Sequence, residues 1–188
     1  MLNGINDWSK TTFLLSDERL CDKNAESSNH YQLQKFFVEL ISDDLCKPDI
    51  ISVPENFYLS KASEKKQKLF SSLIEHYRYP KFSLLGLGSD SHTASLFPYN
   101  KNNIQLKNEN CFFMKRDNES YYRITLSYSY IMESDEIVFL VIGDNKSEAI
   151  YNSLHSKYDP LRYPVQYIIK NYHRKITLFS DSKALSML

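Results

Sequence analysis

The residues best suited to acid–base chemistry lie between positions 82 and 98, in the stretch FSLLGLGSDSHTASLFP. An apolar run typical of a buried strand ends at Gly86 and Gly88, and Asp90 and His92 follow. Glycine permits positive φ and close approach of the backbone to a ligand. The pattern predicts a strand-to-helix turn whose free N–H groups bind an anion or a developing oxyanion. A tight turn with a capping aspartate fits the same spacing.

Two other polar turns follow apolar segments in the same way. Residues 11–16 are predicted to form a buried strand, and Asp17, Glu18 and Arg19 come directly after it. Residues 136–142 form a continuous apolar run typical of a central parallel strand, and the turn that follows ends at Lys146. Charges directly after such strands are expected on the rim of a sheet. A solvated loop at positions 17–19 is the alternative.

The remaining elements alternate between strands and helices. Caps at Ser28 and Asn29 precede an amphipathic helix. Its expected core residues are Leu33, Phe36, Phe37, Leu40 and Ile41. A second amphipathic helix is predicted over residues 60–77, with Leu69, Phe70, Leu73, Ile74 and Tyr77 on its apolar face. Further segments are a helix through 149–154, a short segment around 165–169, and strands at 50–53, 82–85, 111–114, 123–127 and 175–179.

This alternation predicts an α/β layer fold with a mostly parallel sheet. In such sheets ligands bind beyond the carboxyl ends of the strands. If the three strands are neighbours, a carboxylate pair, an imidazole and two cations face one crevice. That set suits an anionic substrate undergoing acid–base chemistry, with phosphate as the usual partner of the cations. Arg123 opens a strand rather than ending one, so a surface charge is its alternative.

The same positions resemble the signatures of the 6-phosphogluconolactonase family. That family's pattern Gly-x-Gly-x-Asp-Gly-His-Thr-Ala-Ser-Leu-Phe-Pro matches residues 86–98 except at Ser91, where the family has Gly. The family's Asp-Glu-Arg, Ser-Asn, Arg-x-Thr-Leu and Gly-x-x-Lys motifs match residues 17–19, 28–29, 123–126 and 143–146 in the same order. The resemblance therefore covers nearly the whole chain.

The resemblance implies a Rossmann-like, three-layer fold in which helices flank a mostly parallel twisted sheet. It implies hydrolysis of 6-phosphoglucono-δ-lactone to 6-phosphogluconate in the pentose phosphate pathway, with no metal or organic cofactor. His92 would be the general base and Asp90 would orient it or its water. The other expected substrate-binding residues are Arg19, Lys146 and Arg123 for the phosphate, Asp17 and Asn29 for loop or sugar hydroxyls, and the turn around Gly86 and Gly88.

Two departures leave other functions open. A residue at a left-handed position costs about 1 kcal/mol of strain when it is not glycine, so Ser91 is expected to be strained if the family's Gly uses positive φ. The chain is also expected to be N-terminally shortened, without the family's Gly-rich phosphate loop. This leaves a non-catalytic sugar-phosphate-binding remnant or subunit as an alternative. A sugar-phosphate isomerase or deaminase of the same superfamily is another, although deaminases lack the Arg after Asp-Glu and the Thr-Ala-Ser-Leu-Phe-Pro continuation.

Composition sets the remaining expectations. A chain of 188 residues is expected to form a single domain, residues 1–188. Its 23 basic and 23 acidic residues balance, which argues against nucleic acid or a membrane surface as partner. Three scattered cysteines and the absence of a signal-like N-terminus predict a cytoplasmic protein with reduced thiols. A partner chain or self-association is expected to cover the apolar surface left by the missing N-terminal unit.

Overall fold

The computed structural model describes residues 7–41, 46–77 and 79–188 of the chain. The chain forms two compact units, each made of two separate stretches. Unit 1 comprises Met1–Ile74 and Phe113–Ile124, and unit 2 comprises Glu75–Phe112 and Thr125–Leu188. The prediction of a single domain therefore stays a prediction, and the two units are described separately below.

Unit 2 is built on a parallel three-stranded sheet in the order β4–β7–β8. The strands are β4 (Phe82–Leu85), β7 (Glu136–Val141) and β8 (Lys175–Ser180), with Leu85 opposite Phe139 and Val141 opposite Ser180. The parallel pairing and the central place of β7 confirm the sequence prediction. Because all three strands run in the same direction, the loops that follow them leave from one edge of the sheet.

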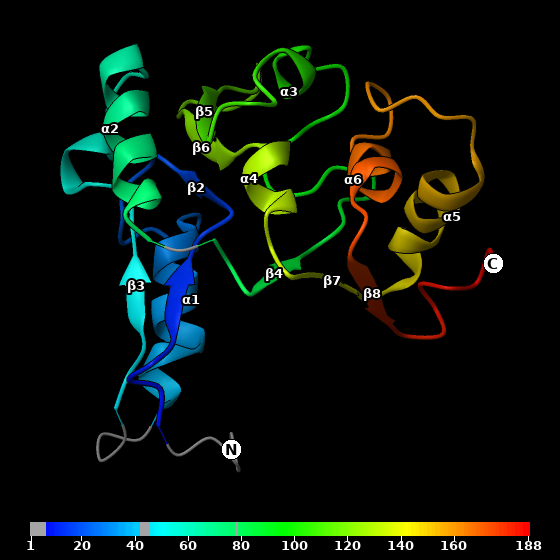
Figure 1. Cartoon of the computed structure of the whole chain (residues 1–188), viewed down its shortest axis with the longest axis horizontal. Helices are drawn as coiled ribbons and strands as arrows, with labels where there is room; N and C mark the ends of the chain where they lie inside the picture. Colours follow the sequence, from blue (N-terminus) through cyan, green and yellow to red (C-terminus); the bar gives the residue numbers. More distant parts are fainter. Residues whose placement is uncertain (1–6, 42–45, 78) are drawn as a thin grey trace. The chain divides into compact units, whose positions relative to one another are not determined.

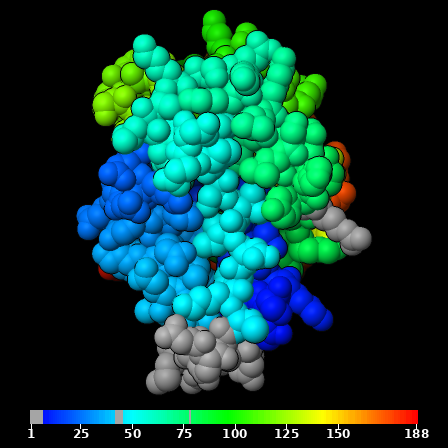
Figure 2. All heavy atoms as spheres, turned by 90° about the vertical axis from the view of Figure 1, so that its left-hand side faces the viewer, coloured from blue at the N-terminus to red at the C-terminus, as the bar shows by residue number. Residues whose placement is uncertain are grey.

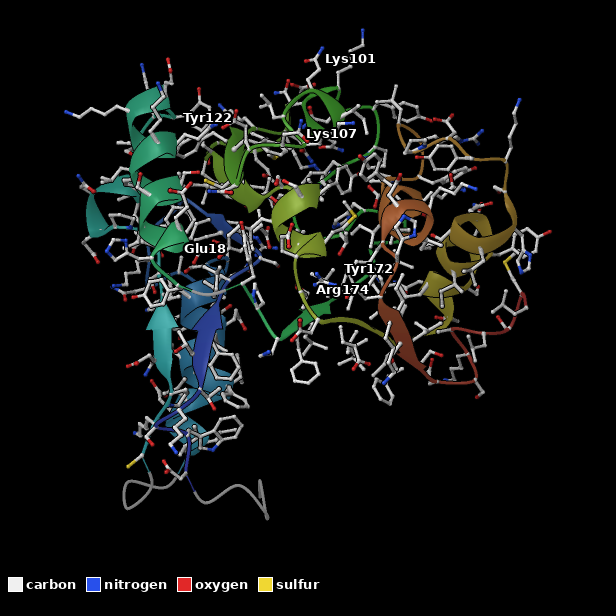
Figure 3. The ribbon with its side chains drawn as sticks, viewed as in Figure 1. Glu18, Lys101, Lys107, Tyr122, Tyr172 and Arg174 are labelled. Atoms are coloured by element: carbon white, nitrogen blue, oxygen red, sulfur yellow. The ribbon has the colours of Figure 1, made fainter. Side chains whose placement is uncertain are left out.

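Helices cover one face of this sheet (Figure 1). They are α4 (Tyr128–Met132), α5 (Ser147–His155) and α6 (Val165–Asn171), and α3 (Asn102–Gln105) belongs to the same unit. Side chains that point from the sheet toward the helices are buried, including Ile137, Phe139 and Val141. Just after the C-terminal end of α4, the carbonyl oxygen of Ser134 accepts hydrogen bonds from Tyr172 and Arg174 at 2.8 Å each (Figure 3).

The opposite face of the sheet is formed by alternate residues of the three strands, and it carries the ion pair of Lys175 with Glu136 at one end. Its exposed apolar members are Phe82, Leu84, Leu140 and Phe179. Phe82 is 66% exposed and Leu84 is 65% exposed. The sequence predicted a central parallel strand, and such strands usually bury both faces, but in β7 only every second residue is buried. We call these four side chains the open face of unit 2.

Unit 1 contains a second pair of parallel strands, β1 (Thr12–Leu14) and β3 (Asp49–Ile51), with Phe13 opposite Ile50. Its helices are α1 (Asn29–Phe36) and α2 (Glu64–Glu75), and it has single 3-10 turns η1 (Val38–Leu40) and η2 (Glu55–Phe57). Figure 2 shows the side of this unit on which the blue residues around α1 lie beside the cyan stretch that leads to α2. Phe57, Phe70 and Ile74 are buried in its core.

A third sheet has the strand order β2–β6–β5. Its strands are β2 (Asp17–Arg19), β6 (Arg123–Leu126) and β5 (Cys111–Met114). The division between the two units passes through the middle of β5 and of β6. The α/β class and the parallel pairing agree with the sequence prediction, but the strands of the described residues belong to three sheets rather than one.

Three local predictions differ from the structure, and one segment without a predicted type is now defined. Residues 17–19 form β2 instead of a charged rim, and Glu18 is buried. The segment near residue 165 is the helix α6. The two predicted apolar stripes are only partly core: Phe36, Leu40 and Leu69 are exposed, whereas Ile41, Phe70 and Ile74 are buried. Helical periodicity marks a face, but neighbouring elements decide how much of that face is covered.

The turn after β4 does not open a helix. Residues 86–101 form turns and one isolated bridge between Thr93 and Leu96, and the next helix is α3. The predicted helix start at Asp90 and His92 was therefore wrong. Positive φ angles at Ser91, Ala94 and Tyr99 are incompatible with a continuous helix here. The environment of His92 is consequently set by its side-chain contacts and not by a helix N-terminus.

Candidate active site

His92 and Asp90 form a hydrogen-bonded pair in the turn after β4. The Nδ1 atom of His92 contacts Oδ1 of Asp90, and the ring packs against Phe97 with centroids 4.4 Å apart. Burial acts to raise the pKa of the Asp90 carboxyl, but the hydrogen bond and charge of His92 outweigh burial and lower it. An ionised Asp90 accepts from Nδ1–H, which leaves Nε2 of the neutral imidazole as the proton acceptor.

Gly88 makes room for the His92 ring. A Cβ atom at this position would lie 2.0 Å from Nδ1 of His92 and 2.7 Å from Oδ1 of Asp90. The Gly88 N–H donates to the His92 carbonyl at 2.8 Å, so this amide is engaged inside the turn. Gly86 differs, because a Cβ there would meet no atom within 4 Å. Gly88 is thus required by the imidazole, whereas the space beside Gly86 is open.

Ser91 occupies the left-handed conformation, which is the condition under which strain is expected at this position. Its φ is 65°, and the residue is 1% exposed. Its hydroxyl donates to the carbonyl of Ala149 at 3.3 Å, and its own carbonyl accepts from Val165 N–H at 3.2 Å. These bonds fix the turn to α5 and α6. Ala94 and Tyr99 also have positive φ, so backbone strain gathers around His92.

The turn that ends at Lys146 begins at another residue with positive φ. Gly143 has a φ of 104°, which glycine adopts far more readily than other residues. Its N–H donates to Oδ1 of Asp181 at 3.0 Å, and the same oxygen accepts from Ala184 N–H at 2.9 Å. These two backbone N–H groups lower the pKa of Asp181. Asp181 follows β8 directly, so it anchors the Lys146 turn from the neighbouring strand.

Two of the three predicted polar turns lie at one edge of a sheet. The Asp90–His92 turn follows β4 and the Gly143–Lys146 turn follows β7, and these strands are parallel neighbours. The third predicted turn, at Asp17–Arg19, belongs to unit 1. Asn29 and Arg123 belong to unit 1 as well. The convergence of both sets on one crevice stays a prediction.

Within unit 1, Asp17 links Asn29 and Arg123. The Asn29 side-chain amide donates to the Asp17 carbonyl at 2.8 Å and to its Oδ1 at 3.0 Å. The Arg123 guanidinium lies 3.5 Å from Asp17 Oδ2 and donates to both oxygens of Glu119 at 2.8 and 2.6 Å. Burial acts to lower the pKa of Arg123, but these carboxylates raise it overall. Arg123 is therefore a buried cation with two carboxylate partners.

Arg19 differs from Arg123, because one of its hydrogen-bond donors has no partner among the described residues. Its Nη1 donates to the carbonyl of Ser27 at 2.7 Å. Its Nε–H is buried and has no hydrogen-bond partner among the described residues. An unpaired buried donor costs free energy, of the order of 1–3 kcal/mol, that an incoming acceptor recovers. Of the two arginines, Arg19 is thus the one prepared to receive an anion.

Sequence reasoning missed Glu18 as a site residue, although it lies between Asp17 and Arg19. Its carboxylate is buried and accepts hydrogen bonds from β2, α1 and Tyr58 (Figure 3). The residue types at positions 17–19 carried no signal for this burial, because it depends on the contacts of Glu18 with α1 and Tyr58.

A paired carboxylate and imidazole follow β4, and a lysine turn follows the neighbouring parallel strand β7. This arrangement is typical of α/β enzymes, in which ligands bind beyond the carboxyl ends of the strands. The sequence model of the family described as Glucosamine-6-phosphate isomerases/6-phosphogluconolactonase matches residues 3–178. The chain belongs to this family, as its motifs predicted.

Curated relatives and solved structures agree with this assignment. The 6-phosphogluconolactonase of Helicobacter pylori (strain ATCC 700392 / 26695) is 28% identical over 171 residues, which cover 90% of this chain and 70% of the relative. The crystal structure of a 6-phosphogluconolactonase from Shewanella baltica OS155 matches with a TM-score of 0.79 at 20% identity, covering 92% of this chain and 72% of the other.

The fold alone does not separate the two activities in the family's description. A monomeric glucosamine-6-phosphate deaminase of the NagB superfamily matches with a TM-score of 0.76 at 16% identity, over 97% of this chain and 77% of that one. The choice between lactone hydrolysis and amino-sugar chemistry therefore depends on the residues of the site.

Proposed function

We propose that this chain hydrolyses 6-phospho-D-glucono-1,5-lactone to 6-phospho-D-gluconate, a step of the pentose phosphate pathway. The observation that carries the proposal is the Asp90–His92 pair in its strained turn after β4, on the side of the sheet edge that also holds Lys146. The names of the curated relatives support it, since the Helicobacter pylori protein is a 6-phosphogluconolactonase.

His92 is the general base in this reaction. Its Nε2 takes a proton from water as the water oxygen attacks the lactone carbonyl carbon, and Asp90 accepts the hydrogen bond of Nδ1–H, which makes Nε2 the nitrogen that takes the proton. When the tetrahedral intermediate collapses, the bond to the ring oxygen breaks and His92 returns the proton to that oxygen. General-base catalysis of this kind contributes about 10²–10⁴-fold.

Backbone donors of the same turn stabilise the oxyanion. The Gly88 N–H is engaged with the His92 carbonyl, so the role passes to its neighbours. The Ser89 N–H has no hydrogen-bond partner among the described residues, and Ser89 is an exposed residue. Gly86 keeps the backbone open to the substrate, because a Cβ there would enter the free space beside the turn, whereas a Cβ at Gly88 would occupy the position of the His92 ring.

The phosphate ligands in this proposal are Lys146, Arg19 and Arg123, the residues that match the family's motifs. Arg123 is a cation already balanced by Glu119 and Asp17. The unpaired Nε–H of Arg19 supports its part in this set. Asn29 and Asp17 hold the sugar hydroxyls.

The first experiment measures hydrolysis of freshly made 6-phosphoglucono-δ-lactone by the wild-type chain and by His92→Ala, corrected for spontaneous opening. We expect activity above background in the wild type and a loss of at least about 10²-fold in the variant. Equal rates for wild type, variant and buffer would exclude catalysis and favour a non-catalytic sugar-phosphate-binding protein.

Glucosamine 6-phosphate is the discriminating second substrate. A lactonase releases no ammonia from it, whereas a deaminase does. The Arg at position 19 and the residues 93–98 favour the lactonase, because the deaminases lack both features.

Association and location complete the proposal. The open face of unit 2 supports the expected self-association, in which a second copy covers the exposed apolar side chains. No helix in the described part of the chain is long and apolar enough to cross a membrane. The cytoplasmic location stays a prediction.

A further inference from the structure

Glu18 is a buried carboxylate whose hydrogen-bond donors are all uncharged. The residue is 1% exposed. Its Oε1 accepts from Arg19 N–H at 2.6 Å and from Asn29 N–H at 2.8 Å. Its Oε2 accepts from His30 N–H at 2.7 Å, from the Ser28 hydroxyl at 3.2 Å and from the Tyr58 hydroxyl at 3.3 Å. Burial of a charge is costly unless it is fully hydrogen-bonded, and five donors meet that need here.

Two of these donors belong to the first turn of α1. The N–H groups of Asn29 and His30 have no partner inside the helix, because the first four amides of an α-helix never do. Glu18 supplies their acceptors from β2, where the helix dipole favours a negative charge. The hydrogen bonds of the Glu18 carboxylate therefore hold the start of α1 beside β2.

These two elements carry three residues of the proposed substrate site. Asn29 reaches from α1 to Asp17 in β2 through two hydrogen bonds, and Arg19 in β2 reaches Ser27 just before the α1 cap. Glu18 stands between Asp17 and Arg19 and holds the backbones of both Arg19 and Asn29. A shift of α1 against β2 would change the spacing of all three.

We propose that Glu18 is the positioning residue of the phosphate and hydroxyl contacts in unit 1: it does not touch the substrate, and it sets the relative placement of Asp17, Arg19 and Asn29. The inference rests on the proposed sugar-phosphate site. Only a carboxylate fits this role, because an amide would turn an NH₂ group toward one of the N–H donors.

The test compares wild type with Glu18→Gln in lactone hydrolysis and in calorimetric binding of 6-phosphogluconate. We expect KM and the dissociation constant to rise at least about tenfold, because charge-assisted hydrogen bonds are lost. We expect kcat to change by less than about threefold, since Asp90 and His92 lie in the other unit. Unchanged KM and unchanged affinity in a folded Glu18→Gln variant would overturn the inference.

Tyr58→Phe keeps the test decisive if Glu18→Gln does not fold. It removes one neutral donor to Oε2 and leaves the carboxylate in place. The expected rise in KM is about two- to tenfold, with the amide resonances of Asn29 and His30 shifted upfield. A Tyr58→Phe variant with wild-type KM and unshifted amides would overturn the inference as well.

Glu55→Gln is the matched control. Glu55 lies in the same unit, its side chain is 76% exposed, and it pairs with Lys23. The same chemical change there should leave KM and affinity within about twofold, since exposed ion pairs contribute little.

The two proposals fail in different ways. If the wild type binds 6-phosphogluconate but hydrolyses no lactone, the proposed catalysis fails, and weaker binding by Glu18→Gln still supports the positioning role. If the wild type is active and Glu18→Gln is kinetically unchanged, the positioning role fails alone. A wild type without binding or activity overturns both.

Discussion

Asp90 determines which nitrogen of His92 is free to accept a proton. Because the carboxylate accepts from Nδ1–H, Nε2 remains the basic nitrogen. An asparagine at position 90 can present its NH₂ group instead, which stabilises the tautomer with the proton on Nε2. We therefore expect Asp90→Asn to lower kcat by about 10²–10⁴-fold with little change in KM, measured by steady-state lactone hydrolysis. A kcat within threefold of wild type would show that Asp90 does not orient His92.

Ser91 offers a measurement of backbone strain beside the site. Ser91→Ala removes the hydrogen bond to Ala149 and keeps the strained φ of 65°, whereas Ser91→Gly removes both. We expect the glycine variant to be more stable than the alanine variant by about 1 kcal/mol, from the cost of the left-handed conformation. Urea unfolding of the two variants gives the difference. An alanine variant as stable as the glycine variant would mean that the turn relaxes.

At the scale of single residues, features that lie within a sequence motif could be predicted, whereas features that depend on packing in the folded chain could not. The pairing of Asp90 with His92, the strain at Ser91 and the link between Asn29 and Asp17 involve neighbours in sequence or matched motifs. The buried role of Glu18 and the pairing of Arg123 with Glu119 could not be predicted, because burial depends on elements that pack together only in the folded chain.

Gly86 and Gly88 belong to one sequence pattern in the turn after β4, but they have different roles. A Cβ at Gly88 meets the His92 ring at 2.0 Å, whereas a Cβ at Gly86 meets nothing within 4 Å. We expect Gly88→Ala to displace the imidazole and reduce kcat at least about 10²-fold, as expected for loss of a general base. Gly86→Ala should keep wild-type thermal stability and kcat but raise KM, because its methyl group enters the space proposed for the substrate.

Both variants need kinetics and a melting curve on the same preparation. A Gly88→Ala variant with normal kcat would show that the ring moves without loss of function. A Gly86→Ala variant with normal KM would place the substrate elsewhere.

The Lys146 turn depends on Asp181 from the adjacent strand. Asp181→Ala removes the acceptor of the Gly143 and Ala184 amides. We expect KM to rise about tenfold with kcat kept, since the turn that carries Lys146 loses its anchor. Asp181→Asn should recover most of the loss, because its side-chain oxygen still accepts. Amide exchange at Gly143 reports the anchor directly, and an amide that stays protected in Asp181→Ala would contradict this prediction.

At the scale of elements, apolar strands were predictable and helix starts were less so. β4, β7 and β8 lie where short apolar runs placed them. The helix expected at Asp90 was wrong because capping residues also serve tight turns, and the positive φ angles that exclude a helix do not show in residue types other than glycine. α6 was left undefined because Val165 and its neighbours are too few to show a period.

At the scale of the whole molecule, the open face of unit 2 is the largest departure from a covered parallel sheet. Sheets of this kind normally bury both faces. We expect the wild type to associate as its concentration rises, measured by sedimentation velocity. Leu84→Lys with Leu140→Glu should weaken this association without loss of thermal stability, because both side chains are exposed. Sedimentation as a monomer at every concentration, for wild type and variant alike, would contradict the prediction.

The route of the chain through β5 and β6 has a consequence for biosynthesis. Unit 1 lacks its last strand residues until Ile124 has been made, and by then the whole stretch Glu75–Phe112 of unit 2 already exists. Unit 2 remains incomplete until β8 follows, because β7 pairs with both β4 and β8. At translation rates of about 5–20 residues per second, β4 waits several seconds for its sheet. During that interval Leu85, which is buried in the folded unit, is available to a chaperone, and slower codons after position 124 would prolong its exposure.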